Sequence, residues 1–194
     1  FIVGGTGAGS QIETMPAMIN KLFGTKIKIV SGYKGGNDVY IAMERGEVHG
    51  RCGGLKSSIK STRPEWFPQK KVSVPIQIAL ARDPEFADSP ALIEFTKDDK
   101  TRLILQLILS PMDMDRPILL PPGTPPDKVA ALRRAFRAAM KDPGFVAEAK
   151  KASIDLDEIP GEKLHAILDR AYAMPPEVIR EAKDAMSVVG ASID

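Results

Sequence analysis

Two glycine-rich segments contain the residue types best suited to chemistry in this chain. They are Gly4–Ser10 and Ser31–Gly36, and each lies between a short apolar run and a helical pattern. Glycine lets the backbone turn tightly and approach a ligand closely. The helix that follows directs free N–H groups and the positive end of its dipole at the same point. Each segment therefore predicts a site for an anion such as phosphate, sulfate or carboxylate.

The spacing within Gly4–Ser10 argues against a nucleotide. A P-loop needs Lys before its final Ser or Thr, and here Gly9 precedes Ser10. A dinucleotide fingerprint needs a third glycine where Ser10 stands and an acidic residue about 20 positions further on, which Ile27–Val30 lacks. The remaining alternatives are a bound small anion and a tight turn with only a structural role.

The second segment repeats this arrangement one strand further along the chain. Asn37 and Asp38 can cap the helix that follows it. Lys34 could add a formal charge to the helix dipole, and Tyr33 could form a wall of the pocket. The alternative is a solvated lysine beside a partly buried tyrosine. Two glycine-rich helix starts at adjacent strand ends indicate that the turns share one ligand.

Other groups that perform chemistry are sparse, and we expect no catalytic residue, no metal and no cofactor. The sequence has no G-x-S-x-G, H-E-x-x-H or C-x-x-C motif. Two ligands do not make a zinc site, so we expect Cys52 to be a small packed residue and His49 to end a strand. The single cysteine excludes an internal disulfide.

The elements that position the two segments follow a repeated order of strand, glycine turn and helix. This order occurs three times, which predicts an α/β fold with a parallel core sheet and all its turns at the carboxyl ends of strands. Ser10 and Glu13 have the spacing of a capping box at the start of the first helix. The predicted strands are Phe1–Val3, Lys26–Val30, Val48–Cys52 and Val72–Leu80, and the predicted helices are Ser10–Phe23, a helix after Asn37 that Gly46 stops, and Leu55–Ser61.

After Arg82 the sequence becomes mainly helical. We predict a boundary that separates an α/β ligand-binding lobe, residues 1–116, from a hinge strand and the helical part of another lobe, residues 117–194. Leu132, Phe136 and Met140 lie at helical spacing, and we expect them in a core. The predicted elements are a helical turn at Ala91–Phe95, a strand at Pro117–Leu120, and helices at Lys100–Leu109, Pro126–Lys141, Gly144–Lys151, Gly161–Ala173 and Pro176–Met186.

Composition is ordinary for a soluble globular protein, with 43% apolar and 27% charged residues. The net charge of +2 and the mixing of basic with acidic residues argue against a nucleic-acid partner. No signal peptide is evident, but a mature exported protein would have lost one. Composition therefore leaves the location open.

Four short motifs resemble the substrate-binding receptors of tripartite tricarboxylate transporters, often called Bug-type. They are Tyr33-Lys34-Gly35-Gly36, Gly46-Glu47-Val48, Pro122-Gly123-Thr124-Pro125 and Asp142-Pro143, and the likeness covers nearly the whole chain. The resemblance implies a two-lobed type II periplasmic-binding-protein fold. It also implies a periplasmic receptor that carries a di- or tricarboxylate, or a related organic acid anion, to membrane permease subunits.

Carried over residue by residue, the resemblance places ligand binding on the two glycine segments. His49 and Arg51 depart from the family pattern, which leaves the ligand open. The family's first-lobe strands would lie upstream of Phe1, so we expect a fragment whose uncovered apolar helices favour self-association. The alternative function is an enzyme or sensor domain that binds a phosphorylated cofactor or substrate. The predicted ligand-binding residues are Gly5, Thr6, Gly7, Ala8, Gly9, Ser10, Tyr33, Lys34, Gly35 and Gly36.

Overall fold

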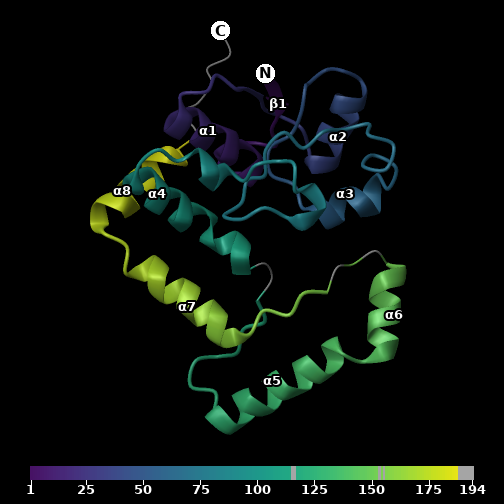
Figure 1. Ribbon diagram of the computed structural model, residues 1–194, viewed down its shortest axis with the longest axis vertical. Helices are drawn as coiled ribbons and strands as arrows, with labels where there is room; N and C mark the ends of the chain where they lie inside the picture. The colour runs from purple at the N-terminus through teal and green to yellow at the C-terminus, as the bar shows by residue number, and fades with distance from the viewer. Residues whose placement is uncertain (115–116, 153, 155, 188–194) are drawn as a thin grey trace. The chain divides into compact units, whose positions relative to one another are not determined.

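The computed structural model describes residues 1–114, 117–152, 154 and 156–187 (Figure 1). The described residues form two compact units. Unit 1 comprises Phe1–Leu55, Val74–Leu109 and the residues from Met174 onward, and unit 2 comprises Lys56–Ser73 and the described residues of Ser110–Ala173. The boundaries of these units differ from the predicted boundary between residues 116 and 117. The predicted division into two lobes stays a prediction.

The sheet of unit 1 is parallel, as predicted, but within the described residues it is smaller than predicted. Strand β1 (Ile2–Gly4) pairs with β2 (Lys28–Val30), and Val3 lies opposite Ile29. The predicted third strand, Val48–Cys52, is reduced to one parallel bridge between Val3 and Gly50. The strand prediction for this segment was therefore wrong in extent, although the segment does lie beside β1.

Helices α1 (Gln11–Phe23) and α2 (Gly36–Glu44) follow the two glycine segments and agree closely with the predicted ranges. On α1 the apolar face is buried, and Gly24 ends the helix in the left-handed conformation at φ 65°. On α2, Val39 and Ala42 form a buried cluster with Val48. Pro16 lies inside α1 and is buried, and the helix continues past it. Both helices are therefore fixed by packing on one face.

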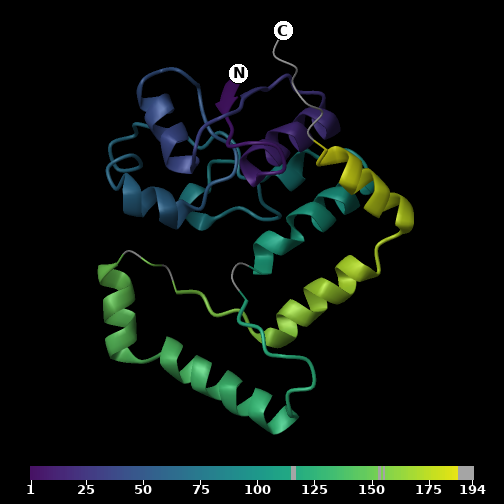
Figure 2. The ribbon, with the colours of Figure 1, turned by 180° about the vertical axis from the view of Figure 1, so that it is seen from behind.

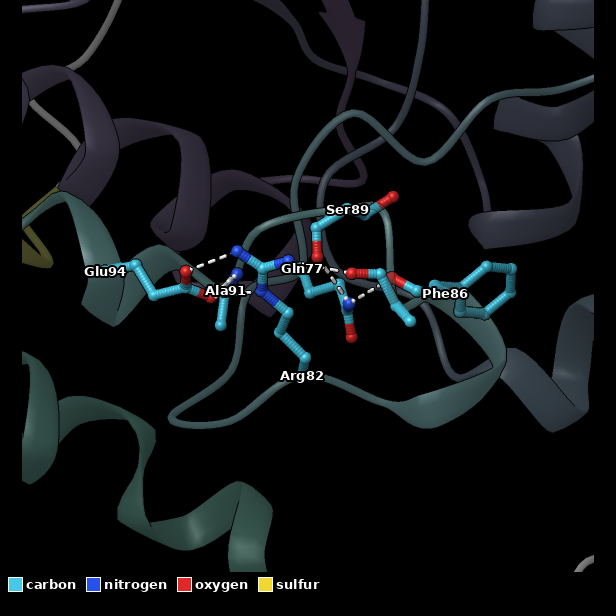
Figure 3. A network of polar contacts seen from close by, with 7 residues as sticks. Gln77, Arg82, Phe86, Ser89, Ala91 and Glu94 are labelled. Carbon is cyan, nitrogen blue, oxygen red and sulfur yellow. Dashed lines mark hydrogen bonds and ion pairs between the residues drawn. The ribbon is translucent and has the colours of Figure 1, made fainter.

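The segment Val72–Leu80, predicted as a buried strand, is reduced to one parallel bridge between Gln77 and Ala91. Instead, the buried side chain of Gln77 organises it (Figure 3). The Nε2 group donates to the carbonyls of Phe86 and Ser89 at 2.9 and 2.8 Å, and Oε1 accepts from the Asp83 N–H at 2.7 Å. One amide thus satisfies three backbone groups of the loop that follows the segment.

The last part of unit 1 is a helix pair. Helix α4 (Asp99–Leu109) packs along α8 (Pro176–Ala185), and the two lie side by side in both ribbon views (Figures 1 and 2). Helix α8 also contacts α1, where Lys21 pairs with Asp184 at 2.5 Å. Lys100 of α4 pairs with Glu181 at 2.7 Å. The chain therefore returns to unit 1 after passing through unit 2.

Unit 2 consists mainly of helices. Segment Pro117–Leu120 is not a strand, and Ile118 and Leu119 are exposed. Leu132 and Phe136 are also exposed, so their assignment to a core was wrong. None of the helices within the described residues is long and apolar enough to cross a bilayer. The helices are α3 (Lys56–Thr62), α5 (Pro126–Met140), α6 (Pro143–Lys151) and α7 (Gly161–Tyr172), and the 3-10 turns of the chain are Pro84–Phe86, Leu92–Phe95 and Ser110–Met114.

Candidate anion-binding site

Both glycine segments meet at one edge of the sheet. The Gly5 N–H donates to the Val30 carbonyl at 2.8 Å, and the Tyr33 N–H donates back to the Gly5 carbonyl at 3.1 Å. The Gly4 N–H donates to the Gly50 carbonyl at 3.1 Å, which brings the segment that contains Gly50 to the same edge. The predicted adjacency of the turns is therefore present within unit 1.

The N–H groups of the first segment divide into two sets. The first set donates to protein acceptors: Gly4, Gly5 and Ser10 to backbone carbonyls, and Gly7 to the Glu13 carboxylate. Those of Thr6, Ala8 and Gly9 make no hydrogen bond to any residue that the structure describes, and Ala8 and Gly9 are exposed. The second set is free to bind a ligand.

The first segment needs glycine at particular positions. Gly7 has φ 126° and Gly9 has φ 83°, conformations that a side chain makes unfavourable. Gly5 is required for another reason, because a Cβ there would lie 2.4 Å from Glu13 Oε1. The loop is therefore built closely around the Glu13 side chain.

Glu13 does not play the predicted role in a capping box. Its Oε1 accepts from the Gly7 N–H at 2.7 Å, and only 1% of the residue is exposed. Ser10 occupies the N-cap position, but its side chain makes no capping hydrogen bond. The Ser10 hydroxyl is buried and has no hydrogen-bond partner among the described residues. The carboxylate reaches back into the loop because the glycines leave space for it.

The second segment places Tyr33 and Lys34 differently. A Cβ on Gly4 would lie 3.1 Å from the Tyr33 ring, so the ring packs against the end of β1. Lys34 is exposed and forms no ion pair with a described residue. Gly35 is the N-cap of α2 with an extended backbone, and Gly36 begins the helix. The segment thus presents a helix start with a solvated cation beside it.

Arg51 is the residue that sequence reasoning did not assign to this site. Its Nη1 donates to the Gly36 carbonyl at 3.3 Å, and its guanidinium lies 4.6 Å from the centre of the Tyr40 ring. A Cβ on Gly36 would lie 2.5 Å from Nη1, so the guanidinium occupies the space beside the start of α2. The signal in the sequence was the departure of Arg51 from the family pattern.

His49 and Cys52 have contacts that fit a structural role. The His49 Nδ1 accepts from the Ile2 N–H at 3.0 Å, which extends the pairing at the start of β1. Burial raises the pKa of the Cys52 thiol to about 11. The described residues contain no group of three or more His, Cys, Asp or Glu side chains that could hold a metal ion. Cys52 is therefore a packed thiol in its protonated form.

Comparison with known proteins gives one informative result. No protein-family model matches the chain, and no curated protein matches it. Among solved structures, it is similar to a TctC solute binding protein from Polaromonas, solved without a ligand, with a TM-score of 0.62 and 18% identity. The match covers 93% of this chain and 57% of that one. The chain therefore shares the α/β fold of a TctC solute-binding protein, in agreement with the resemblance in the sequence.

Proposed function

We propose that this chain is the ligand-holding part of an extracytoplasmic solute-binding receptor. It binds a small organic acid anion and delivers it, chemically unchanged, to membrane permease subunits in the periplasm. One observation carries this proposal. The N–H groups of Thr6, Ala8 and Gly9 remain available at the same sheet edge as the start of α2.

These donors and the start of α2 together suit the oxygen atoms of an organic acid. A carboxylate needs several hydrogen bonds to leave water, and backbone N–H groups at a helix start provide them together with a favourable dipole. Lys34 and Arg51 add two positive charges near the start of α2, and neither forms an ion pair with a described residue. In this proposal the ligand contacts the ten residues named in the sequence analysis, with Arg51 added to them.

The fold supports a receptor in preference to an enzyme. The structure to which the chain is similar is that of a solute-binding protein. In such a protein binding itself is the function, so a site made mainly of backbone donors is sufficient. The carboxylate class, the periplasmic location and the permease partner all belong to the proposal.

A ligand panel tests the proposal. We expect a thermal shift and calorimetric binding with one class of organic acid, and none with phosphate, NAD or ATP. A ligand at 100 times its Kd stabilises by about 2.7 kcal/mol, which raises Tm by roughly 5–10 °C at this chain length. Binding of a nucleotide, with no response to any acid, would overturn the proposal in favour of an enzyme or sensor.

A matched pair of variants localises the site. Lys34→Met removes the cation beside the second segment, whereas Lys26→Met removes another exposed lysine outside both glycine segments. We expect Lys34→Met to weaken acid binding about threefold or more, and Lys26→Met to leave it unchanged. Equal effects of the two variants would place the ligand elsewhere.

A further inference from the structure

We infer that the two glycine segments present opposite charges to the ligand and so select its chemical class. This inference rests on the proposed function. The first segment takes a neutral acceptor oxygen, from an amide, carbonyl or hydroxyl group. The second takes the carboxylate. The preferred ligand is then a monocarboxylate with a second, uncharged acceptor, and dicarboxylates and tricarboxylates bind more weakly.

The negative charge lies beneath the first segment. Glu13 is 1% exposed, and its carboxylate accepts from the Gly7 N–H at 2.7 Å. It forms no ion pair with any residue that the structure describes, so no cation neutralises it. Its position in the first turn of α1 lets the helix dipole stabilise it. One N–H group of the loop, that of Gly7, therefore already binds the protein's own carboxylate.

This carboxylate is a close neighbour of the free donors. The N–H groups of Thr6 and Ala8 belong to the residues on either side of Gly7, whose own N–H holds Glu13. A second anion bound there would lie within a Debye length of Glu13, where salt screens poorly. Hydrogen bonding to an uncharged oxygen uses the same donors without that repulsion. The first segment therefore favours an uncharged acceptor.

The second segment has the opposite charge. The guanidinium of Arg51 lies beside Gly36 and over the Tyr40 ring, which fixes it at the start of α2. Its Nε is buried without a hydrogen-bond partner among the described residues, so its donors are only partly used. Lys34 adds a solvated cation in the same segment. An incoming carboxylate gains charge-assisted hydrogen bonds here.

The test compares ligands that differ only in one charge. Succinate and its monoamide, succinamate, have nearly the same shape, as do glutarate and glutaramate. Kd is measured by calorimetry for both pairs on the wild-type chain, on Glu13→Gln, and on Glu47→Gln as a control for loss of an exposed acid. Glutamine keeps an oxygen that can accept from the Gly7 N–H but removes the charge.

We expect the wild-type chain to bind the monoamide of at least one pair about tenfold more tightly than the diacid. Glu13→Gln should reduce this ratio to about threefold or less, and Glu47→Gln should leave it unchanged. A purely structural role of Glu13 would change both Kd values by the same factor and leave the ratio intact. That result would overturn the inference.

Two further results keep the inference separate from the proposed function. If the wild-type chain binds diacids as tightly as monoamides, the inference is wrong while the receptor proposal stands. If no acid of any kind binds, the receptor proposal itself fails. Should Glu13→Gln not fold, Glu13→Asp retains the charge and must retain the wild-type preference for the monoamide. Loss of that preference in a folded Glu13→Asp variant would also overturn the inference.

Discussion

Arg82 and Glu94 form a two-pronged ion pair. The Arg82 Nε donates to Oε1 at 2.7 Å and Nη2 donates to Oε2 at 2.6 Å (Figure 3). The Ala91 N–H also donates to Oε1 at 2.8 Å. These bonds favour the ionised carboxylate, and the one from Arg82 is the main cause that lowers the pKa of Glu94 from 4.5 to about 2. The pair closes the loop that Gln77 organises.

The first prediction concerns acid stability. Because the pKa of Glu94 is lower in the folded chain, its contribution is complete above pH 4.5 and is lost as the pH falls toward about 2. Arg82→Ala should move the pKa of Glu94 back toward 4.5, as measured by carboxyl NMR titration. In this variant, Tm should also fall less than in the wild-type chain as the pH is lowered from 4.5 to about 2. An unchanged titration of Glu94 in the variant would contradict the assigned cause.

The second prediction tests the close packing of Gly5 on Glu13. Gly5→Ala places a Cβ 2.4 Å from Oε1, and Glu13 is too buried to move away freely. We expect a loss of about 1–3 kcal/mol in the free energy of unfolding, measured with urea. Gly35→Ala is the control, because the atom nearest its Cβ is Asp38 Oδ2 at 3.7 Å. It should change stability by less than about 1 kcal/mol. Equal costs would argue that Glu13 is not held in place.

The third prediction concerns thiol reactivity. Burial raises the pKa of Cys52 to about 11, so at pH 8 roughly one thiol in a thousand is ionised, against about one in ten at the ordinary value of 9.0. Alkylation by iodoacetamide should therefore be at least about tenfold slower in the native chain than in concentrated urea. Similar rates in both conditions would show that the thiol is not desolvated.

The fourth prediction concerns the apolar surface of α5. Leu132 and Phe136 are 51% and 41% exposed on one helix face. A hydrophobic surface of this kind favours association. We expect the double variant Leu132→Lys/Phe136→Lys to shift the mass measured by light scattering toward the monomer, with less than about 1 kcal/mol change in stability. A fully monomeric wild-type chain at high concentration would remove the basis of this prediction.

Local signals in the sequence predict the helices well. Periodic apolar residues and end signals such as Gly24 placed every α-helix of the described chain within about two residues of its ends. Strands were predicted less well, because a strand requires a partner that no local pattern specifies. At Val72–Leu80 the backbone pairing is limited to one bridge between Gln77 and Ala91, and the Gln77 side chain binds the loop that follows. The apolar face of α5 that contains Leu132 shows the same limit of local patterns. Periodicity identifies an apolar face but does not say what covers it.

Part of the candidate site could also be predicted from local sequence signals, and part could not. The two glycine segments could be found because glycines before a helix are a local signal, and the structure brings them to one sheet edge. The loop position of the Glu13 carboxylate and the stacking of Arg51 on Tyr40 depend on distances across the fold. Neither distance follows from spacing along the chain. Whether the predicted residues bind a ligand stays a prediction.

The return of α8 to α1 and α4 has a consequence for how the protein is made. The Lys21–Asp184 contact joins residues 163 positions apart, and most of unit 2 is synthesised between α4 and α8. On the ribosome, the apolar face of α4, which includes Ile104 and Ile108, must wait for α8 to emerge. At about 5–20 residues per second this delay lasts several seconds. During that time the nascent chain has an incomplete core, and a chaperone that shields this face would favour correct folding.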